Sequence, residues 1–267
     1  MLSAEYAKER LRKVETILVT QLTTTNNQTP YDRLIEKYGI QIDYRPFTEV
    51  QPVSGKDFRK QKINIEEYTA IIFTSKSAVD HFFRICEDVR YKVPAELKYF
   101  CLSEAIALYL QKHITYRKRK VFFGNRTLQD LKPHLLKHKK KEKFLLPCSN
   151  LGKQAYVKFL TENDFDFDES VMYLAVSSDL TDLENVFYDI LVFFSPLSLD
   201  SLYDNFPNFK QKNTRIAAYG NSTSKAIVDR DLILDIRCPD PNNPGVTSMA
   251  EAIEQYIKLA NESSDEG

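Results

Sequence analysis

Three hydroxyl groups and one ammonium group follow a short apolar run near residue 70, and together they could bind an anion. The run, residues 70–73 (Ala-Ile-Ile-Phe), is typical of a strand buried on both faces of a parallel sheet. Apolar side chains return at helical spacing over residues 78–83, so a helix begins at the turn. Its free backbone N–H groups favour anions, and open α/β sheets bind ligands at that edge. The candidates are Thr74, Ser75, Lys76 and Ser77, although the serines are equally suited to capping the helix.

The same strand, turn and helix recur later in the chain. Residues 188–202 align with the first copy, so that Phe193 falls on Phe73 and Ser195 on Ser75. Another hydroxyl-rich turn, residues 221–224, follows an expected strand at residues 214–220. The repetition predicts two copies of one β/α unit, with polar turns at the strand ends of each copy.

The rest of the chain alternates strands with helices, and this alternation is typical of an α/β fold. Glycine at position 39 suits the left-handed end of the first helix, and Pro133 can kink or divide the helix that contains it. Strands are expected at residues 16–20, 40–44, 70–73, 98–103, 120–123, 143–147, 165–168, 171–176, 190–195, 214–220 and 233–236. Further helices are expected at residues 31–38, 104–113, 127–137, 154–163, 197–205, 225–230 and 248–260, with a frayed tail at 261–267.

Two extended connectors, near residues 45–52 and 169–177, give the natural domain cuts. Proline at positions 46 and 52 keeps the first connector extended. The cuts define a middle domain of residues 47–173 and a discontinuous first domain of residues 1–46 plus 174–267. The residues alone leave open whether the ends of the chain join in this way or two domains follow in series.

Composition excludes several classes of function. The 267 residues carry 37 basic and 37 acidic side chains, so no net field points to nucleic acid or a membrane surface. Local basic runs at residues 117–120 and 137–143 are solvated surfaces or help to attract a polyanion. The four cysteines and four histidines show no metal-ligand spacing, and Cys148 has no histidine near it in sequence for nucleophilic catalysis. Residues 1–13 lack the apolar core of a signal peptide, so a cytoplasmic protein is expected.

Over nearly its whole length the chain resembles the uroporphyrinogen-III synthase family. The resemblance rests on the Phe-Thr-Ser-Lys-Ser-Ala-Val turn at 73–79, Tyr173, the Phe-Ser-Pro turn at 194–196, residues 218–226 and Pro239-Asp-Pro241. It implies two similar flavodoxin-like parallel-sheet α/β domains, joined by a two-stranded connector around a cleft. The first and last parts of the chain would then form one domain.

The resemblance also implies a reaction. Members of the family cyclise hydroxymethylbilane, a linear tetrapyrrole with carboxylates on every ring, to uroporphyrinogen III, inverting ring D and losing water. They use no cofactor or metal. A monomer and a transient contact with the deaminase that makes the bilane are expected. A tyrosine such as Tyr173 could donate a proton to the departing hydroxyl, and interdomain packing is its alternative role.

The family's motifs add further substrate-binding candidates. Lys153 would take the place of an arginine common in the family, although Lys76, Lys153 and Lys225 also suit solvated surface charges. N-capping competes with substrate contact at Ser222 and Thr223. The candidates added by the motifs are Ser103, Ser149, Lys153, Pro196, Ser198, Gly220, Ser222 and Thr223, beside Ser195 and the turn at 74–77.

Three positions depart from the family pattern: Gln21, Ile106 and Phe194 stand where members carry polar or small groups. They leave open a second reading, a family member that binds a tetrapyrrole or a protein partner without turnover. A two-lobed binder of small anions or nucleotides is a third, although no GxGxxG or GxxxxGK[ST] loop is present.

Overall fold

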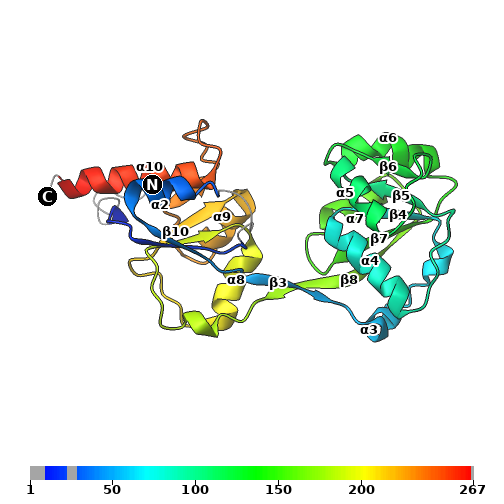
Figure 1. The fold of residues 1–267 in the computed structure, drawn as a ribbon, viewed down its shortest axis with the longest axis horizontal. Helices are drawn as coiled ribbons and strands as arrows, with labels where there is room; N and C mark the ends of the chain where they lie inside the picture. The colour runs from blue at the N-terminus through cyan, green and yellow to red at the C-terminus, as the bar shows by residue number, and fades with distance from the viewer. Residues whose placement is uncertain (1–9, 23–28, 266–267) are drawn as a thin grey trace. The chain divides into compact units, whose positions relative to one another are not determined.

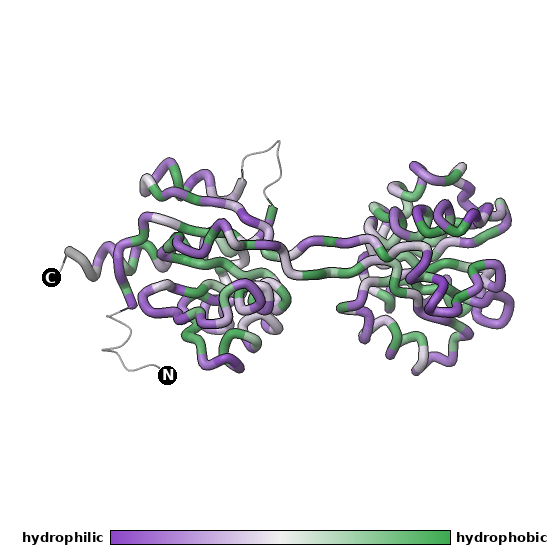
Figure 2. Tube along the Cα trace, turned by 90° about the horizontal axis from the view of Figure 1, so that it is seen from below, coloured by the Kyte–Doolittle hydropathy of each residue, from purple (hydrophilic) through white to green (hydrophobic). Residues whose placement is uncertain are grey.

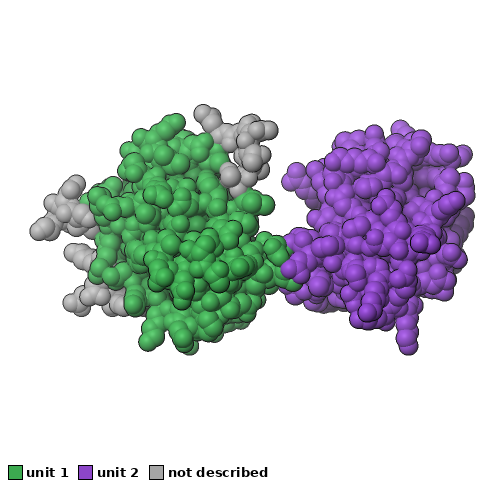
Figure 3. Space-filling view, turned by 60° about the horizontal axis from the view of Figure 1, so that its bottom comes forward, with its two compact units in different colours: residues 1–49, 176–267 green, residues 50–175 purple. Residues whose placement is uncertain are grey.

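The computed structural model describes residues 10–22 and 29–265, and the chain forms two compact units (Figures 1 and 3). Unit 1 comprises residues 1–49 and 176–267, and unit 2 comprises residues 50–175. Strands β3 (Thr48–Pro52) and β8 (Phe167–Ser177) carry the chain from one unit to the other. The expectation of two domains cut at 46/47 and 173/174 stays a prediction. Most of the segment 1–13 and of the polar loop 22–30 lies outside the described residues.

Unit 1 contains a five-stranded parallel sheet in the order β11-β10-β9-β1-β2. Numbered along the chain within the unit, the order is 2-1-3-4-5, as in flavodoxin-like folds. Its strands are β1 (Thr16–Val19), β2 (Gln41–Tyr44), β9 (Ile190–Phe193), β10 (Arg215–Tyr219) and β11 (Ile236–Cys238). Its helices are α2 (Asp32–Tyr38), η3 (Thr181–Leu183), α8 (Pro196–Asn205), α9 (Asn221–Val228) and α10 (Met249–Asp265).

Helices cover both faces of this sheet because successive strand residues point to opposite sides. Ile17 and Val19 pack with α2 and α10, whereas Leu18 packs with α8 and α9. Gly39 ends α2 with a left-handed φ of 65°, as the sequence predicts.

Unit 2 has a six-stranded sheet in the order β3-β8-β7-β4-β5-β6, parallel from β8 to β6. Reading β7 and β8 as its first two strands gives the same 2-1-3-4-5 order, so unit 2 is a circular permutation of unit 1. Its other strands are β4 (Ala70–Phe73), β5 (Lys98–Cys101), β6 (Val121–Phe123) and β7 (Phe144–Ser149). Its helices are α3 (Gly55–Lys60), η1 (Ile65–Glu67), α4 (Lys76–Asp88), α5 (Glu104–Tyr109), η2 (Leu110–Lys112), α6 (Leu128–His138) and α7 (Gln154–Glu162).

The central strand of unit 2 is buried on both faces, as its apolar run predicts. Ile71 and Phe73 pack with α4 and α5, while Ala70 and Ile72 pack with α6 and α7. All four side chains are fully inaccessible to solvent. Figure 2 shows the same distribution, with apolar residues gathered inside each unit. The predicted fold class, two parallel α/β sheets, is confirmed.

Several expected elements are wrong in their bounds. The strand expected at 233–236 is β11 (Ile236–Cys238), because its register is set by pairing with β10. The two strands expected at 165–168 and 171–176 form one strand, β8, since β7 and β3 flank it. Pro133 lies within an undivided α6.

The last helices also differ from expectation. Residues 221–224 are the first turn of α9, so this helix begins earlier than the expected 225. The final helix continues to Asp265, and Glu266 and Gly267 lie outside the described residues. Within the part of the chain that the structure describes, no helix has the length and apolar character needed to cross a membrane.

Asp189, just before β9, holds the beginning of β1. One carboxylate oxygen accepts hydrogen bonds from the backbone N–H groups of Glu15 (2.9 Å) and Thr16 (3.0 Å). The other oxygen lies 3.5 Å from the guanidinium of Arg215, whose side chain is 2% exposed. This carboxylate therefore offsets a buried charge and joins two segments that are distant in sequence.

We predict that Asp189→Ala lowers the free energy of unfolding by about 3 kcal/mol, because the Arg215 charge would stay buried without its carboxylate. Urea unfolding measures the change. The control is Asp182→Ala, which removes a 58% exposed partner of Arg45 and should cost less than about 0.5 kcal/mol. Equal effects of the two substitutions would contradict the role of Asp189.

Candidate active site

The phenol of Tyr173 lies beside the amino terminus of α4. Tyr173 is on β8, in register with Ser149 at the end of β7, which brings it to the carboxyl edge of the parallel sheet. Its hydroxyl oxygen is 3.2 Å from Oγ of Ser75, and the side chain is 9% exposed. Ser75 also caps α4, because its Oγ accepts a hydrogen bond from Ala78 N at 3.0 Å. The structure thus joins two predicted site residues that are far apart in sequence.

Burial raises the pKa of the Tyr173 phenol, and the hydrogen bond with Ser75 only partly opposes this shift. The phenol therefore stays protonated at neutral pH and can donate a proton. Such a donor next to a helix amino terminus suits a reaction in which a negatively charged or hydroxyl group departs.

His81, which the sequence reasoning missed, holds Tyr173 in place. Its ring stacks on the phenol, with centroids 4.9 Å apart and planes at 17°. Nε of Arg84 donates to Nδ1 of His81 at 3.3 Å, so this nitrogen is an acceptor and the ring is neutral. Arg84 also donates to the carbonyls of Val53 (2.7 Å) and Met172 (3.2 Å). Only the stacking in the folded structure identifies His81 as a site residue, because its position in the sequence relative to Ser75 matches no motif.

The other candidates of unit 2 line the same sheet edge without forming one cluster. Ser77 lies inside α4, so its expected capping role is wrong. Ser103 occupies the N-cap position of α5 but makes no side-chain cap hydrogen bond. The Ser149 hydroxyl accepts from Leu151 N at 3.0 Å in the turn after β7. Thr74 is half-buried at the end of β4.

Of the candidate lysines, Lys76 is the one best placed to meet a substrate anion. It is exposed at the start of α4, 5.3 Å from the Tyr109 ring, with no carboxylate partner among residues 10–22 and 29–265. Lys153 pairs with Glu169 at 2.6 Å, and Lys225 pairs with Asp229 at 2.5 Å. Both of these lysines are therefore partly neutralised.

In unit 1 the candidate residues follow β9 and β10. Ser195 caps α8 in a capping box with Ser198, and Pro196 is the first residue of this helix. This arrangement reproduces Ser75 at the start of α4, as the sequence repeat predicts.

The capping role expected for Ser222 and Thr223 is wrong. The N-cap of α9 is Gly220, whose φ of 85° favours glycine. Since glycine has no side chain, no side chain caps this helix. Ser222 is exposed, whereas Thr223 is fully buried and its hydroxyl has no hydrogen-bond partner in the described part of the chain.

A pocket of about 340 Å³ opens at the carboxyl edge of the unit 1 sheet. Gln21 and Phe194, two of the departures from the family pattern, line it. Phe194 packs against Tyr219, with ring centroids 5.9 Å apart, and Tyr44 and Ser248 are among the other lining residues. Sequence reasoning missed Tyr44 and Tyr219, although each ends a strand of the sheet.

The described residues contain no group of three or more His, Cys, Asp or Glu side chains that could hold a metal ion. Cys148 is buried, and burial raises the pKa of its thiol to about 11. Since the thiolate is the nucleophile, this residue is unsuited to covalent catalysis at neutral pH.

Comparisons with known proteins bear on the family. The family model described as uroporphyrinogen-III synthase HemD matches residues 29–247. A uroporphyrinogen-III synthetase from Helicobacter pylori is 17% identical with a TM-score of 0.56, covering 92% of this chain and 99% of that one. A mutant uroporphyrinogen III synthase from the extremely thermophilic bacterium Thermus thermophilus is 12% identical with a TM-score of 0.51, covering 93% and 99%. These two structures show the fold alone, and no curated protein matches the chain.

We predict that the pKa of His81 lies below its usual 6.5, because burial and the neighbouring Arg84 charge disfavour the protonated ring. The folded protein then binds this proton less readily than the unfolded chain. The neutral His81 ring therefore contributes its full share of the folding stability above about pH 6.5. This contribution is lost as the pH falls toward the lower pKa that His81 has in the folded protein.

An NMR titration of the histidine rings measures this pKa. Urea unfolding of the wild type and His81→Phe should show the wild type losing stability relative to the variant between about pH 7 and pH 5. A wild type that gains relative stability on acidification would overturn the assignment.

Proposed function

The chain belongs to the uroporphyrinogen-III synthase family, and on this premise we propose that it cyclises hydroxymethylbilane to uroporphyrinogen III with inversion of ring D and loss of water. The observation that carries the proposal is the protonated Tyr173 phenol, held by Ser75 and His81 at the amino terminus of α4. The hydro-lyase activity needs a proton donor at the departing hydroxyl, and this phenol supplies one.

Tyr173 acts as the general acid in the proposed mechanism. The C–O bond of the ring A hydroxymethyl group breaks, the phenol proton passes to the departing oxygen, and water leaves. A carbon of ring D attacks the resulting azafulvenium cation, and rearrangement through a spiro intermediate inverts ring D. When ring D regains its aromaticity it loses a proton. The Tyr173 phenolate accepts this proton, so the protein ends unchanged.

Each unit offers a helix amino terminus that can bind a substrate carboxylate, that of α4 in unit 2 and that of α8 in unit 1. At α4 the backbone N–H groups of Lys76 and Ser77 have no partner in the described chain and can bind an anion. At α8 only the N–H of Leu197 is left in the first turn, because Pro196 has no N–H and the capping box uses the N–H groups of Ser195 and Ser198. Lys76 adds a positive charge beside the first of these turns. Orienting a flexible substrate accounts for most of the rate in this proposal, because the hydroxyl leaves readily from an electron-rich pyrrole.

The remaining expectations follow from the same proposal. The product enters tetrapyrrole biosynthesis and supplies the haem, sirohaem or cobalamin branches. The enzyme acts as a cytoplasmic monomer without a cofactor and makes a transient contact with the deaminase that supplies the bilane. No nucleic acid or membrane takes part.

A second candidate function is tetrapyrrole binding without turnover. Three observations favour it: Ile106 is buried in the core, Phe194 packs on Tyr219, and the Thr223 hydroxyl is buried. All three remove polar groups from positions where a carboxylate-rich substrate needs them.

The first test of function uses the purified chain coupled to a deaminase that generates hydroxymethylbilane. We expect the type III isomer, separated chromatographically from the type I isomer that forms spontaneously. Type I alone at high protein concentration would contradict turnover. Saturable porphyrinogen binding in that case would select the second candidate function.

We predict that Tyr173→Phe lowers kcat roughly ten- to hundredfold, the loss expected when one hydrogen bond worth about 1–3 kcal/mol is removed from the transition state. The fold should survive, because phenylalanine still stacks on His81. Tyr203→Phe is the matched control, since Tyr203 is half-buried and lies in the second half of α8, away from the amino terminus of that helix. If Tyr173→Phe retains the wild-type rate and isomer purity, the phenol is only a packing group.

A further inference from the structure

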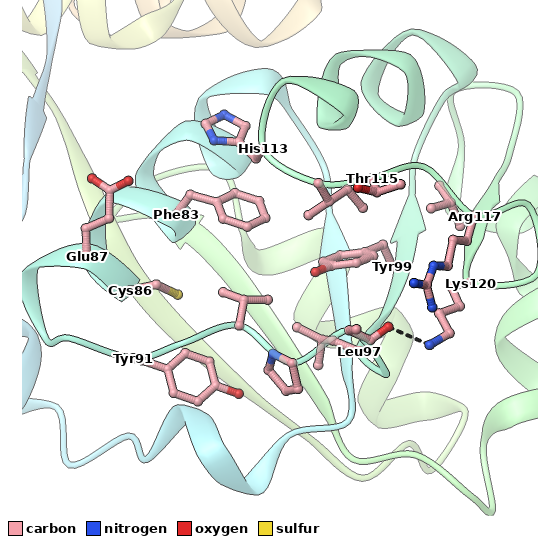
Figure 4. A pocket seen from close by; sticks show the side chains of 15 residues that line it. Phe83, Cys86, Glu87, Tyr91, Leu97, Tyr99, His113, Thr115, Arg117 and Lys120 are labelled. Atoms are coloured by element: carbon pink, nitrogen blue, oxygen red, sulfur yellow. Dashed lines mark hydrogen bonds between the residues drawn. The ribbon is translucent and has the colours of Figure 1, made fainter.

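A pocket of about 390 Å³ lies at the amino-terminal ends of β5 and β6 (Figure 4). Its lining includes Leu97 and Tyr99 at the start of β5 and Val121 at the start of β6. This edge of the unit 2 sheet is opposite the carboxyl ends that carry Ser75 and Tyr173. The pocket therefore shares no residue with the candidate active site.

Aromatic rings form much of the wall. Phe83, Tyr91 and Tyr99 line the space, and Phe83 is fixed by the ring of His113, which stacks on it at 4.5 Å. Cys86, in α4, lies between Phe83 and Tyr91, and its sulfur is directed toward the cavity (Figure 4). Such a lining suits a flat apolar body.

The hydroxyl of Tyr99 points into this space without a hydrogen-bond partner in the described chain (Figure 4). The side chain as a whole is only 3% exposed, but its hydroxyl is not among the polar atoms that are buried without a partner. The half-buried Tyr91 likewise has no partner for its hydroxyl among residues 10–22 and 29–265. A hydroxyl that faces the pocket without a protein partner can pair with a polar group of a ligand bound there.

The charges at the mouth are placed unevenly. Arg117 is exposed and forms no ion pair within the described residues, although its charge, after that of Lys120, helps to lower the pKa of the Glu96 carboxyl. Lys120 is already paired, since its ammonium lies 2.8 Å from Glu96. Glu87 lies across the pocket from Arg117 (Figure 4). An anionic group on a ligand would consequently be attracted to the Arg117 side.

We propose that this pocket binds a small planar aromatic carboxylate, with its ring among Phe83, Tyr91 and Tyr99 and its carboxylate at Arg117. The Tyr99 hydroxyl, which is directed away from Arg117, forms a hydrogen bond with a polar group on the ring of the ligand (Figure 4). The cavity lies within the range of about 300–1,000 Å³ typical of small-molecule sites, and one or two fused rings fit it. The site does not depend on the proposed turnover of a tetrapyrrole.

Indole-3-acetate is a suitable probe, because the chain contains no tryptophan and the indole fluorescence belongs to the ligand alone. Titration of the full chain should show saturable binding of one molecule. Tyr99→Phe, which removes the hydroxyl that accepts from the indole N–H, and Arg117→Gln, which removes the exposed cation at the carboxylate, should each weaken the affinity roughly five- to tenfold. Lys118→Gln, in the same basic run but outside the pocket, should bind as the wild type does.

Tryptamine carries the same ring with a cation in place of the carboxylate, and we expect no saturable binding of it. Urea unfolding checks that Tyr99→Phe is folded, and Arg117→Gln alters only an exposed side chain. Three results would overturn the proposal: no saturable binding of indole-3-acetate, equal affinity in the wild type and both pocket variants, or tryptamine binding as tightly.

Discussion

The pairing of β1 on both of its edges is the constraint on which the rest of the chain depends. β1 hydrogen-bonds to β2 on one side and to β9 on the other. The buried backbone groups of a central strand need partners on both edges, so the amino-terminal segment must join residues far along the chain. The chain accordingly leaves unit 1 after β2 and returns before β9. Unit 2 is therefore an insertion between β2 and β9. The chain enters it through β3 and leaves it through β8.

Duplication explains why the two units carry similar polar turns. Unit 2 uses the same strand order as unit 1 but begins with the third strand of the pattern. Ser75 and Ser195 have nearly equal backbone angles, with φ of −153° and −151°. The same local physics, an extended cap residue whose hydroxyl binds the third helical N–H group, thus recurs at both central strands.

The two edges of the unit 2 sheet present different chemistry, and the direction of its helices is the reason. Helix amino termini meet the carboxyl ends of the strands, so free N–H groups there favour anions. At the opposite edge the helices end in carbonyl groups, which repel anions. A site for an anion at that edge needs a side-chain cation, and Arg117 beside the aromatic pocket is such a group.

The sequence by itself determined the elements whose cause lies within a few residues. The apolar run 70–73, the left-handed end at Gly39 and the caps Ser75 and Ser195 all depend on near neighbours. Only the tertiary structure decided the stacking of His81 on Tyr173, the Lys153–Glu169 pair and the burial of Thr223. These features depend on which surfaces meet after the strands pair. The local pattern of apolar residues does not predict these contacts, because strand register and helix packing are set by the sheet as a whole.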